Sequence, residues 1–506
     1  MGYTAFLLMI INILSKILGF FREILLSYFY GTGQIATAFQ ISFLIPYTIL
    51  GFVMSGLSTN FIPTYTSLYK SKGRDESDRF TSNILNIIFI IGIIATILAY
   101  IFARQIVFIF AMGYSGEIFE LSVKFTRITI LGMFAQLLNA ILKGYLNIKG
   151  NFVVPGSTGF LYNIVIIVFL IISYKINPIL APVGVATATI FQYVPYIPAI
   201  RGTKYRHKFV LNFKDENVKR LLILALPIIF GVAVNQINMI IDQNLASFIS
   251  DKGISVLTYS TRLYEFVWGI MIVSITTAIY PTLSRLAIES TVKFKVQITK
   301  TISTILYLVI PSAIGIMIFS TEIITLIYKR GKFDENDVTL VSGALFYYSL
   351  GLIGLGVRDV LSSSFYALKL TKIPLINSIE MVILNVISSV ILSRFMGLNG
   401  LALGSTIASF FGAINLYIKL EKQIGKIKCK VMLKNIYKMI ISVLFMAIGS
   451  KVIFTVLHSR FSNNLSLLVS IIFAVIIYAT VSILLRTRQA LDILRAIINK
   501  LESKIV

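Results

Sequence analysis

Basic side chains stand inside several long apolar runs of this sequence, and their chemistry suits the binding of an anionic group. In YSTRLYEFVWGI (259–270), Arg262 lies three residues before Glu265, and the run continues to Tyr280 with no further charge. A charge near the centre of a membrane helix costs about 2.5–3.5 kcal/mol on insertion scales, so it usually faces protein or a water-filled cavity. Arginine offers a planar fork that matches two phosphate oxygens.

Lys16 and Arg22 stand in a second apolar run, where they outnumber the neighbouring acid, Glu23. We predict that Lys16, Arg22 and Arg262 converge on a site for an anionic headgroup that carries phosphate. The alternative is structural, because Arg262 and Glu265 are spaced to pair on one helix face.

Two further pairs of charges need separate explanations. Arg358 is a further candidate for the anion site, and its neighbour Asp359 cannot face it on the same helix. Lys124 and Arg127 lie near the end of a predicted span, so we expect their head groups to snorkel to the interface.

Asp242 in INMIIDQNLAS (237–247) has no basic residue within one helical turn. A bare buried carboxylate must become protonated, find a distant partner or bind a cation. Asn385, Ser389 and Ser405 lie in other apolar runs and could complete a cage of oxygen ligands, so we predict a candidate coupling site for Na+ or H+. The alternative is that these groups only hold helices together.

Enzyme chemistry finds no support in the motifs. The sequence has no GxxxxGK[ST] loop, and its two histidines, His207 and His458, make no HExxH. The single cysteine, Cys429, excludes an intramolecular disulfide framework. No paired carboxylates beside a nucleophile suggest hydrolysis. We therefore predict a protein that is not an enzyme and needs no cofactor beyond the candidate coupling cation.

The composition is that of an all-α polytopic membrane protein. Of 506 residues 57% are hydrophobic and 13% are charged, with a mean hydropathy of +0.87. The formal net charge of +25 could suggest nucleic acid, but the basic residues lie in short loops between apolar spans. The N-terminal segment has no basic n-region, and we read it as a retained first helix.

The apolar runs predict about fourteen transmembrane helices, each long enough to cross a hydrocarbon core of about 30 Å. Their expected positions are roughly 4–29, 35–65, 82–103, 122–147, 157–174, 181–199, 219–248, 255–283, 299–319, 339–367, 374–393, 400–420, 437–457 and 466–485. Lysines and arginines concentrate in alternate loops, which predicts that both termini are cytoplasmic. The tail 486–504 has helical periodicity and is predicted to lie along the cytoplasmic interface.

A weak repeat predicts two halves. FIPTY (61–65) closes the second span and IYPTL (279–283) closes the eighth, and each precedes a basic loop. We expect parallel repeats, with a six-helix lobe over 1–200, a second six-helix lobe over 201–421, and helices 13 and 14 with the amphipathic tail over 422–506.

An ordered series of motifs resembles the MurJ (MviN) lipid II flippase family of the multidrug/oligosaccharidyl-lipid/polysaccharide exporter superfamily. The series covers about four-fifths of the chain and consists of SKILGFFRE (15–23), GTGQIATAF (31–39), FIPTY (61–65), YSTRLYEF (259–266), TTAIYPTLSRLA (276–287), YKRGKF (328–333), SSFYALKLTKIP (363–374) and GLNGLALGSTIA (397–408). The resemblance implies two six-helix bundles around a central cavity, with two C-terminal helices forming a groove for a polyprenyl tail.

The resemblance also implies a task and its residues. The family moves undecaprenyl-diphosphate-linked peptidoglycan precursor, lipid II, from the inner to the outer leaflet of the bacterial cytoplasmic membrane during cell wall biogenesis, by alternating access. Its essential basic residues match Lys16, where arginine is usual, Arg22 and Arg262. Glu23 would hold the two arginines between substrate visits. Its ion site matches Asp242, Asn385 and Ser405.

Two departures leave the cargo open. Thr37 stands where the family often has aspartate, and residues 41–65 contain none of the basic residues common in the family's second helix. The alternatives are a flippase for another polyprenyl-diphosphate-linked glycan and a cation-coupled drug antiporter, which would favour a cavity rich in carboxylates. A membrane glycosyltransferase would need an acidic metal motif. The expected partners are lipid II or a related glycolipid and membrane lipids, with no nucleic acid, and the expected state is a monomer.

Overall fold

The structure, a computed structural model, describes residues 2–427, 430–492 and 494–495, which form helices and connections with no strand. The chain divides into two compact units, each of which packs mainly within itself. The first comprises Met1–Ser255 with Arg330–Asp334, and the second comprises Val256–Lys329 with Glu335–Val506. The lobes predicted over 1–200 and 201–421 follow the sequence repeat instead and stay a prediction. Most of the predicted amphipathic tail lies outside the described residues.

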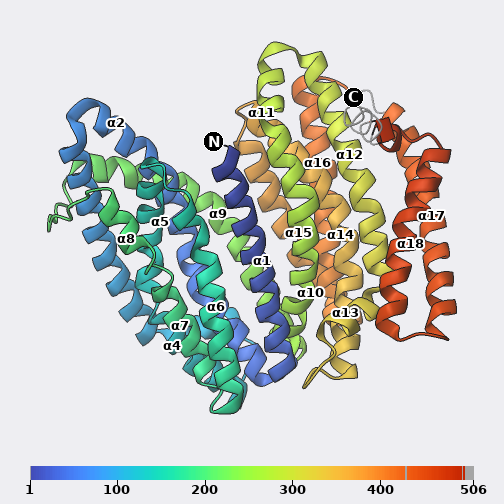
Figure 1. The fold of residues 1–506 in the computed structure, drawn as a ribbon, viewed down its shortest axis with the longest axis horizontal. Coiled ribbons are helices and arrows are strands. Elements are labelled where there is room, and N and C mark those ends of the chain that lie inside the picture. The colour runs from blue at the N-terminus through green and yellow to red at the C-terminus, as the bar shows by residue number, and fades with distance from the viewer. Residues whose placement is uncertain (1, 428–429, 493, 496–506) are drawn as a thin grey trace. The chain divides into compact units, whose positions relative to one another are not determined.

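The helices of the first unit are coloured from blue to green in Figure 1. They are α1 (Gly2–Tyr30), α2 (Gln34–Ile101), α3 (Ala103–Phe110), α4 (Gly116–Ile130), α5 (Met133–Ile148), α6 (Val153–Lys175), α7 (Leu180–Phe191), α8 (Tyr196–Gly202) and α9 (Glu216–Ile249). Within this unit α2 packs against α4, α5 and α9, and α1 packs against α6.

The second unit continues from α10, whose first residues belong to the first unit. Its helices are α10 (Gly253–Trp268), the π-helix η1 (Gly269–Val273), α11 (Ser274–Glu289), α12 (Thr291–Ile318), α13 (Ser320–Tyr328), α14 (Glu335–Ala367), α15 (Lys372–Met396), α16 (Leu398–Ile424), α17 (Lys430–His458) and α18 (Asn463–Leu484). α16 packs between α14 and α15, while α17 and α18 form a hairpin that packs on α12 (Figure 1).

Helix α2 is a single run of 68 residues that contains two predicted spans, 35–65 and 82–103. At 1.5 Å per residue it would be about 100 Å long if straight, far more than one hydrocarbon core requires. The backbone of Gly73 is not helical, with a φ of 82°, and this divides α2 into two arms. Residues with a Cβ disfavour such a φ, so glycine suits the position. Asp78 stabilises the second arm by accepting hydrogen bonds from the hydroxyls of Tyr65 (2.9 Å) and Tyr145 (3.3 Å).

Two predicted spans are interrupted in the structure. The span expected at 122–147 is divided into α4 and α5, with a bend of 41° at Leu131–Gly132. A Cβ at Gly132 would lie 2.9 Å from the Thr189 side chain and 3.0 Å from the carbonyl oxygen of Ala186, so the chain passes α7 closely at this point. The helix expected at 181–199 is interrupted between Phe191, where α7 ends, and Tyr196, where α8 begins, although Leu180–Gly202 as a whole is long and apolar enough to be one span. The sequence therefore predicted these two spans but not the breaks inside them.

Among the described residues, ten helices are long and apolar enough to cross a membrane, or up to eleven if the bent pair α4 and α5 is one span. The count depends on helix length and composition alone, and it takes α2 as one helix. The polytopic, all-helical class is thus confirmed.

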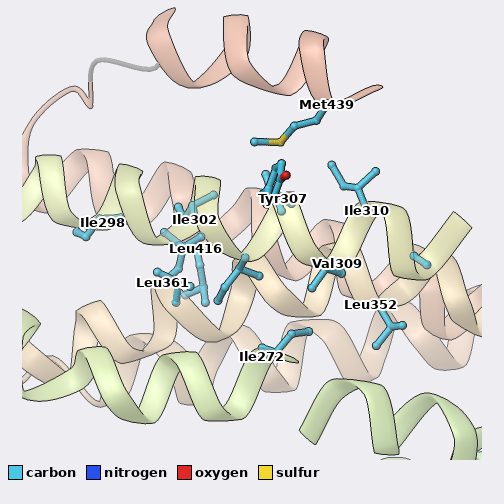
Figure 2. Close-up of a cluster of buried hydrophobic side chains, with 14 of the residues drawn as sticks. Ile272, Ile298, Ile302, Tyr307, Val309, Ile310, Leu352, Leu361, Leu416 and Met439 are labelled. Atoms are coloured by element: carbon cyan, nitrogen blue, oxygen red, sulfur yellow. The ribbon is translucent and has the colours of Figure 1, made fainter. Parts of the chain in front are cut away.

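Apolar side chains from four helices form the core of the second unit. Ile302 and Ile310 of α12 lie among Leu352 of α14, Leu416 of α16 and Met439 of α17, all nearly fully buried. Figure 2 shows Met439 reaching from α17 toward the ring of Tyr307. Tyr307 also accepts a hydrogen bond through its backbone oxygen from the Tyr478 hydroxyl (2.8 Å), so α18 is attached to the same core.

The close approach of α15 and α16 gives a stability prediction. A Cβ at Gly400 would lie 2.4 Å from the backbone of Leu392, whereas a Cβ at Gly315, within α12, would meet nothing within 4 Å. We expect Gly400→Ala to lower the free energy of unfolding by about 1–3 kcal/mol, because overpacking forces the two helices apart. Gly315→Ala is the matched control and should stabilise slightly, because alanine favours helix. Thermal unfolding in detergent measures both, and an unchanged midpoint for Gly400→Ala would contradict the packing.

Candidate functional site

Arg22 lies on α1 in a buried polar cluster of the first unit. Its side chain is 8% exposed and that of Glu23 is 2% exposed. The guanidinium donates from Nη2 to Glu23 Oε1 (2.7 Å) and from Nη1 to Asn163 Oδ1 (3.1 Å). Its carbon lies 4.4 Å from the centre of the Phe43 ring, at the distance of a cation–π contact. Glu23 thus forms a direct ion pair with Arg22, while its predicted role of holding Arg22 and Arg262 between substrate visits stays a prediction.

Partners on two other helices orient this ion pair. Gln40 of α2 donates to the second carboxylate oxygen of Glu23 at 2.8 Å. Asn163 of α6 donates in turn to the backbone oxygens of Gly159 (2.8 Å) and Ser15 (3.3 Å), which fixes the direction of its amide oxygen toward Arg22. Hydrogen bonds to charged groups are worth about 1.5–3 kcal/mol each. Arg22 is consequently held in one geometry, with its charge compensated.

Arg262 lies on α10 in the second unit and pairs with Glu265, Nη1 to Oε2, at 3.0 Å. The i,i+3 pairing anticipated from the spacing is present. The two side chains are 34% and 46% exposed. A pair exposed to this degree contributes about 0–1 kcal/mol. Replacing the contact with Glu265 by a contact with a more strongly bound anion would therefore lose little free energy.

Arg358 and Asp359 of α14 face different neighbours, as their adjacency requires. Arg358 donates from Nη2 to the Ser378 hydroxyl of α15 at 2.7 Å. Asp359 accepts from the Trp268 indole at 3.0 Å. Trp268 is the last residue of α10, and the π-helix η1 follows it at once. Asp359 thus fixes the end of the helix that carries Arg262, and π-helical turns often mark functional sites.

Lys16 is exposed on α1 and makes no hydrogen bond or ion pair that the described residues record. A lysine is a point charge rather than a planar fork, so it can follow an anion without fixed partners. Its place in the candidate site depends on the sequence argument and on the resemblance.

The residues of the candidate ion site fall into two groups. Asn385 of α15 accepts through Oδ1 from Ser389 (3.0 Å) and from Ser405 of α16 (3.3 Å), so these three form one cluster in the second unit. Asp242 belongs to the first unit, where Asn238 donates to it at 3.3 Å. Amide, hydroxyl and carboxylate oxygens suit a hard cation. Over the described parts of the chain, no group of three or more His, Cys, Asp and Glu side chains could hold a metal ion.

Several partners of the charged residues escaped the sequence reasoning. They are Gln40, Phe43, Asn163, Trp268 and Ser378. Asn163 offered one usable signal, because it is a lone amide in the apolar stretch of α6. A polar side chain in such a helix usually needs a partner on another helix.

Apolar helices with charged side chains held inside them define a polytopic membrane protein. The fold is similar to that of an inward-facing multidrug resistance MATE family transporter of the MOP superfamily, with a TM-score of 0.70 and 18% identity, over 84% of this chain and 99% of that one. The chain belongs to the MurJ family, because the model described as lipid II flippase MurJ matches residues 26–477.

Individual relatives agree with this assignment. A probable lipid II flippase MurJ of Buchnera aphidicola is 30% identical over 424 residues, 82% of each chain. A lipid II flippase MurJ of Burkholderia cenocepacia is 26% identical over 423 residues, covering 81% of this chain and 82% of its own. A solved structure of lipid II flippase MurJ in an inward closed conformation has a TM-score of 0.81 and 27% identity, over 95% of this chain and 99% of that one.

Proposed function

We propose that this chain is a lipid II flippase, which moves the undecaprenyl-diphosphate-linked peptidoglycan precursor from the inner to the outer leaflet of the bacterial cytoplasmic membrane. The match to the lipid II flippase family over residues 26–477 carries the proposal. The basic residues inside apolar helices add chemistry that suits a diphosphate. A transporter of this kind needs no catalytic residue of its own.

The finer architecture is part of the proposal. It comprises fourteen spans in two six-helix lobes around a central cavity, two C-terminal helices beside them, and both termini on the cytoplasmic side. The charge bias of the loops supports this orientation. A monomer suffices for alternating access, in which the two lobes rock about a fixed site.

The diphosphate is proposed to bind through Arg262, with Lys16, Arg22 and Arg358 as further basic contacts. Arg262 can exchange its half-exposed carboxylate partner for phosphate oxygens with little loss, because the pair with Glu265 is weak. Arg22 is buried and oriented, and Glu23 balances its charge when no anion is bound. An inside-negative potential favours outward movement of an anion by about 2.3 kcal/mol per charge per 100 mV.

A coupling cation gives a separate prediction. Asp242, with Asn385, Ser389 and Ser405 as further oxygen ligands, is the candidate Na+ site. If Na+ binds at the carboxylate, Asp242→Asn should abolish the dependence of transport on Na+, because a neutral amide holds a monovalent cation far less well than a carboxylate. Transport in vesicles with and without a sodium gradient measures this dependence, and Ser389→Ala is the milder control. Unchanged ion dependence in Asp242→Asn would remove Asp242 from the coupling site.

Complementation in cells tests the proposed function. When the resident lipid II flippase of a bacterium is depleted, expression of this chain is expected to restore growth and the amount of lipid II in the outer leaflet. A flippase for another polyprenyl-diphosphate-linked glycan, or a cation-coupled drug antiporter, would reach the membrane and restore neither. That outcome would overturn the assignment of lipid II as cargo.

A further inference from the structure

The connection between α8 and α9 is a non-helical segment attached along α2. We call residues 205–213 the strap. Asn83 of α2 forms two hydrogen bonds with the backbone of Asn212, donating from Nδ2 to its oxygen (3.0 Å) and accepting from its nitrogen (2.7 Å). Such a reciprocal pair satisfies backbone groups that have no partner in a helix or strand. The end of the strap is therefore held in register on α2.

The beginning and middle of the strap are attached to α2 in the same way. Asn86 donates to the backbone oxygens of Lys208 (3.2 Å) and Val210 (2.8 Å). Ser82 lies 2.7 Å from the Tyr205 hydroxyl and accepts from the backbone nitrogen of Lys208 at 3.2 Å.

His207 adds one more neutral contact on this inner side. Its Nε2 lies 2.9 Å from the amide oxygen of Asn86, and burial lowers the pKa of the His207 imidazole below its usual value. The strap is thus an ordered element, with its backbone and neutral polar side chains on the side of α2.

The outer side of the strap exposes large apolar side chains. Phe209 is 91% exposed, Phe213 57% and Leu211 47%. Phe209 occupies the tip of a tight turn, in which the nitrogen of Val210 donates to the oxygen of Lys208 at 2.8 Å. Leu211 and Phe213 follow Phe209 in the same exposed stretch, so the three residues form a row of exposed apolar side chains. In water such a row would be unfavourable, because no apolar surface covers it.

The attachment on α2 locates the strap at the end of a membrane span. The polar residues Ser82, Asn83 and Asn86 occupy the first turns of the apolar run that continues to Ile101. After the strap, α9 carries Lys219 and Arg220 and then exposes apolar side chains from Leu222 onward. The strap therefore lies at the level where both helices change from charged to apolar surface, which is the level of lipid headgroups.

Basic side chains flank the apolar row. Arg206, Lys208 and Lys214 are exposed, and no acidic residue occurs between Arg201 and Lys214. Each basic residue near an anionic leaflet adds attraction, and apolar side chains inserted between headgroups add burial.

We propose that the strap is an interfacial anchor, which inserts Phe209, Leu211 and Phe213 into the leaflet and binds anionic phospholipid headgroups through Arg206, Lys208 and Lys214. The proposal is independent of the transported cargo. It gives the strap a purpose beyond connection, because it would fix the first unit in the bilayer at this point. A soluble protein partner is the competing occupant of the same surface, and it would leave the row in water when the purified chain is placed in vesicles.

Spin labels on the full chain test this anchor. In a background in which the single cysteine is replaced (Cys429→Ser), Phe209→Cys and, separately, Leu211→Cys carry a nitroxide. Leu211→Cys keeps both phenylalanines of the row. The matched control is Asp75→Cys, which is also exposed and lies in the polar stretch after Gly73 of α2. Relaxation by oxygen, which dissolves in the bilayer, is compared with relaxation by a water-soluble nickel chelate.

In vesicles of phosphatidylcholine and phosphatidylglycerol in equal amounts, the labels at 209 and 211 should relax several-fold more with oxygen than with the chelate, and the label at 75 should show the reverse. In vesicles of phosphatidylcholine alone, both strap labels should become more accessible to the chelate. Joint replacement of Arg206, Lys208 and Lys214 by glutamine should abolish this lipid dependence. If the labels at 209 and 211 are as accessible to the chelate as the label at 75, the proposal of an interfacial anchor is wrong. Insertion that is equal in both lipids would overturn its selectivity for anionic headgroups.

Discussion

Replacing Arg262 by alanine is expected to lower lipid II transport by about 10- to 100-fold while the protein still folds and reaches the membrane. Hydrogen bonds between charged groups contribute about 1.5–3 kcal/mol, and each 1.4 kcal/mol corresponds to a factor of ten. Stability should change little, because the ion pair with Glu265 is half-exposed and weak. Growth rescue of flippase-depleted cells, with the membrane content of the variant measured in parallel, gives the result.

Two further variants separate the charge of Arg262 from its shape and from its partner. Arg262→Lys keeps the charge but loses the planar fork, so it should retain only part of the transport. Glu265→Gln removes the competing carboxylate and keeps Arg262, so transport should persist. Full rescue by Arg262→Ala at the normal membrane content would show that this arginine does not bind the diphosphate.

Replacing Glu23 by alanine is expected to have the largest effect on stability. Glu23 and Arg22 form a buried ion pair, with side chains 2% and 8% exposed. Removing one partner of such a pair leaves an uncompensated charge and costs about 3–5 kcal/mol. Thermal unfolding in detergent should therefore begin well below the temperature of the unmodified protein. An unfolding midpoint equal to that of the unmodified protein would contradict the burial of the pair.

The paired variant Arg22→Met with Glu23→Gln separates stability from transport. Because both charges are removed together, most of the stability lost in Glu23→Ala should return. Lipid II transport should not return, since no guanidinium remains at this position. Recovery of transport together with stability would assign Arg22 a purely structural role.

The apolar runs alone were enough to predict the class of fold, because a helix that crosses a membrane must be long and apolar. The apolar runs did not predict the breaks inside the helices. The break at Leu131–Gly132 has no polar residue to mark it, and it follows from the close passage of α7. In α2 the opposite error arose, since the basic stretch after Tyr65 suggested a loop but remains helical up to the turn at Gly73.

The candidate site was predictable where partners are near in sequence. The spacing of Arg262 and Glu265 on one helix face was sufficient to anticipate their ion pair. Asn163 and Gln40 were not predictable as partners of Arg22 and Glu23, because they lie 141 and 17 residues away along the chain on other helices. Their approach depends on how α1 packs against α6 and α2, which no local pattern specifies.

The most direct test of lipid II transport uses the purified protein in vesicles that contain lipid II in both leaflets. An enzyme added outside the vesicles, and unable to enter them, modifies the lipid II that reaches the outer leaflet. With this protein present, the pool that was initially inside should become accessible, and with Arg262→Ala it should stay largely protected. Accessibility no greater than in protein-free vesicles, under a sodium gradient and an inside-negative potential, would contradict the assignment of this chain as a lipid II flippase.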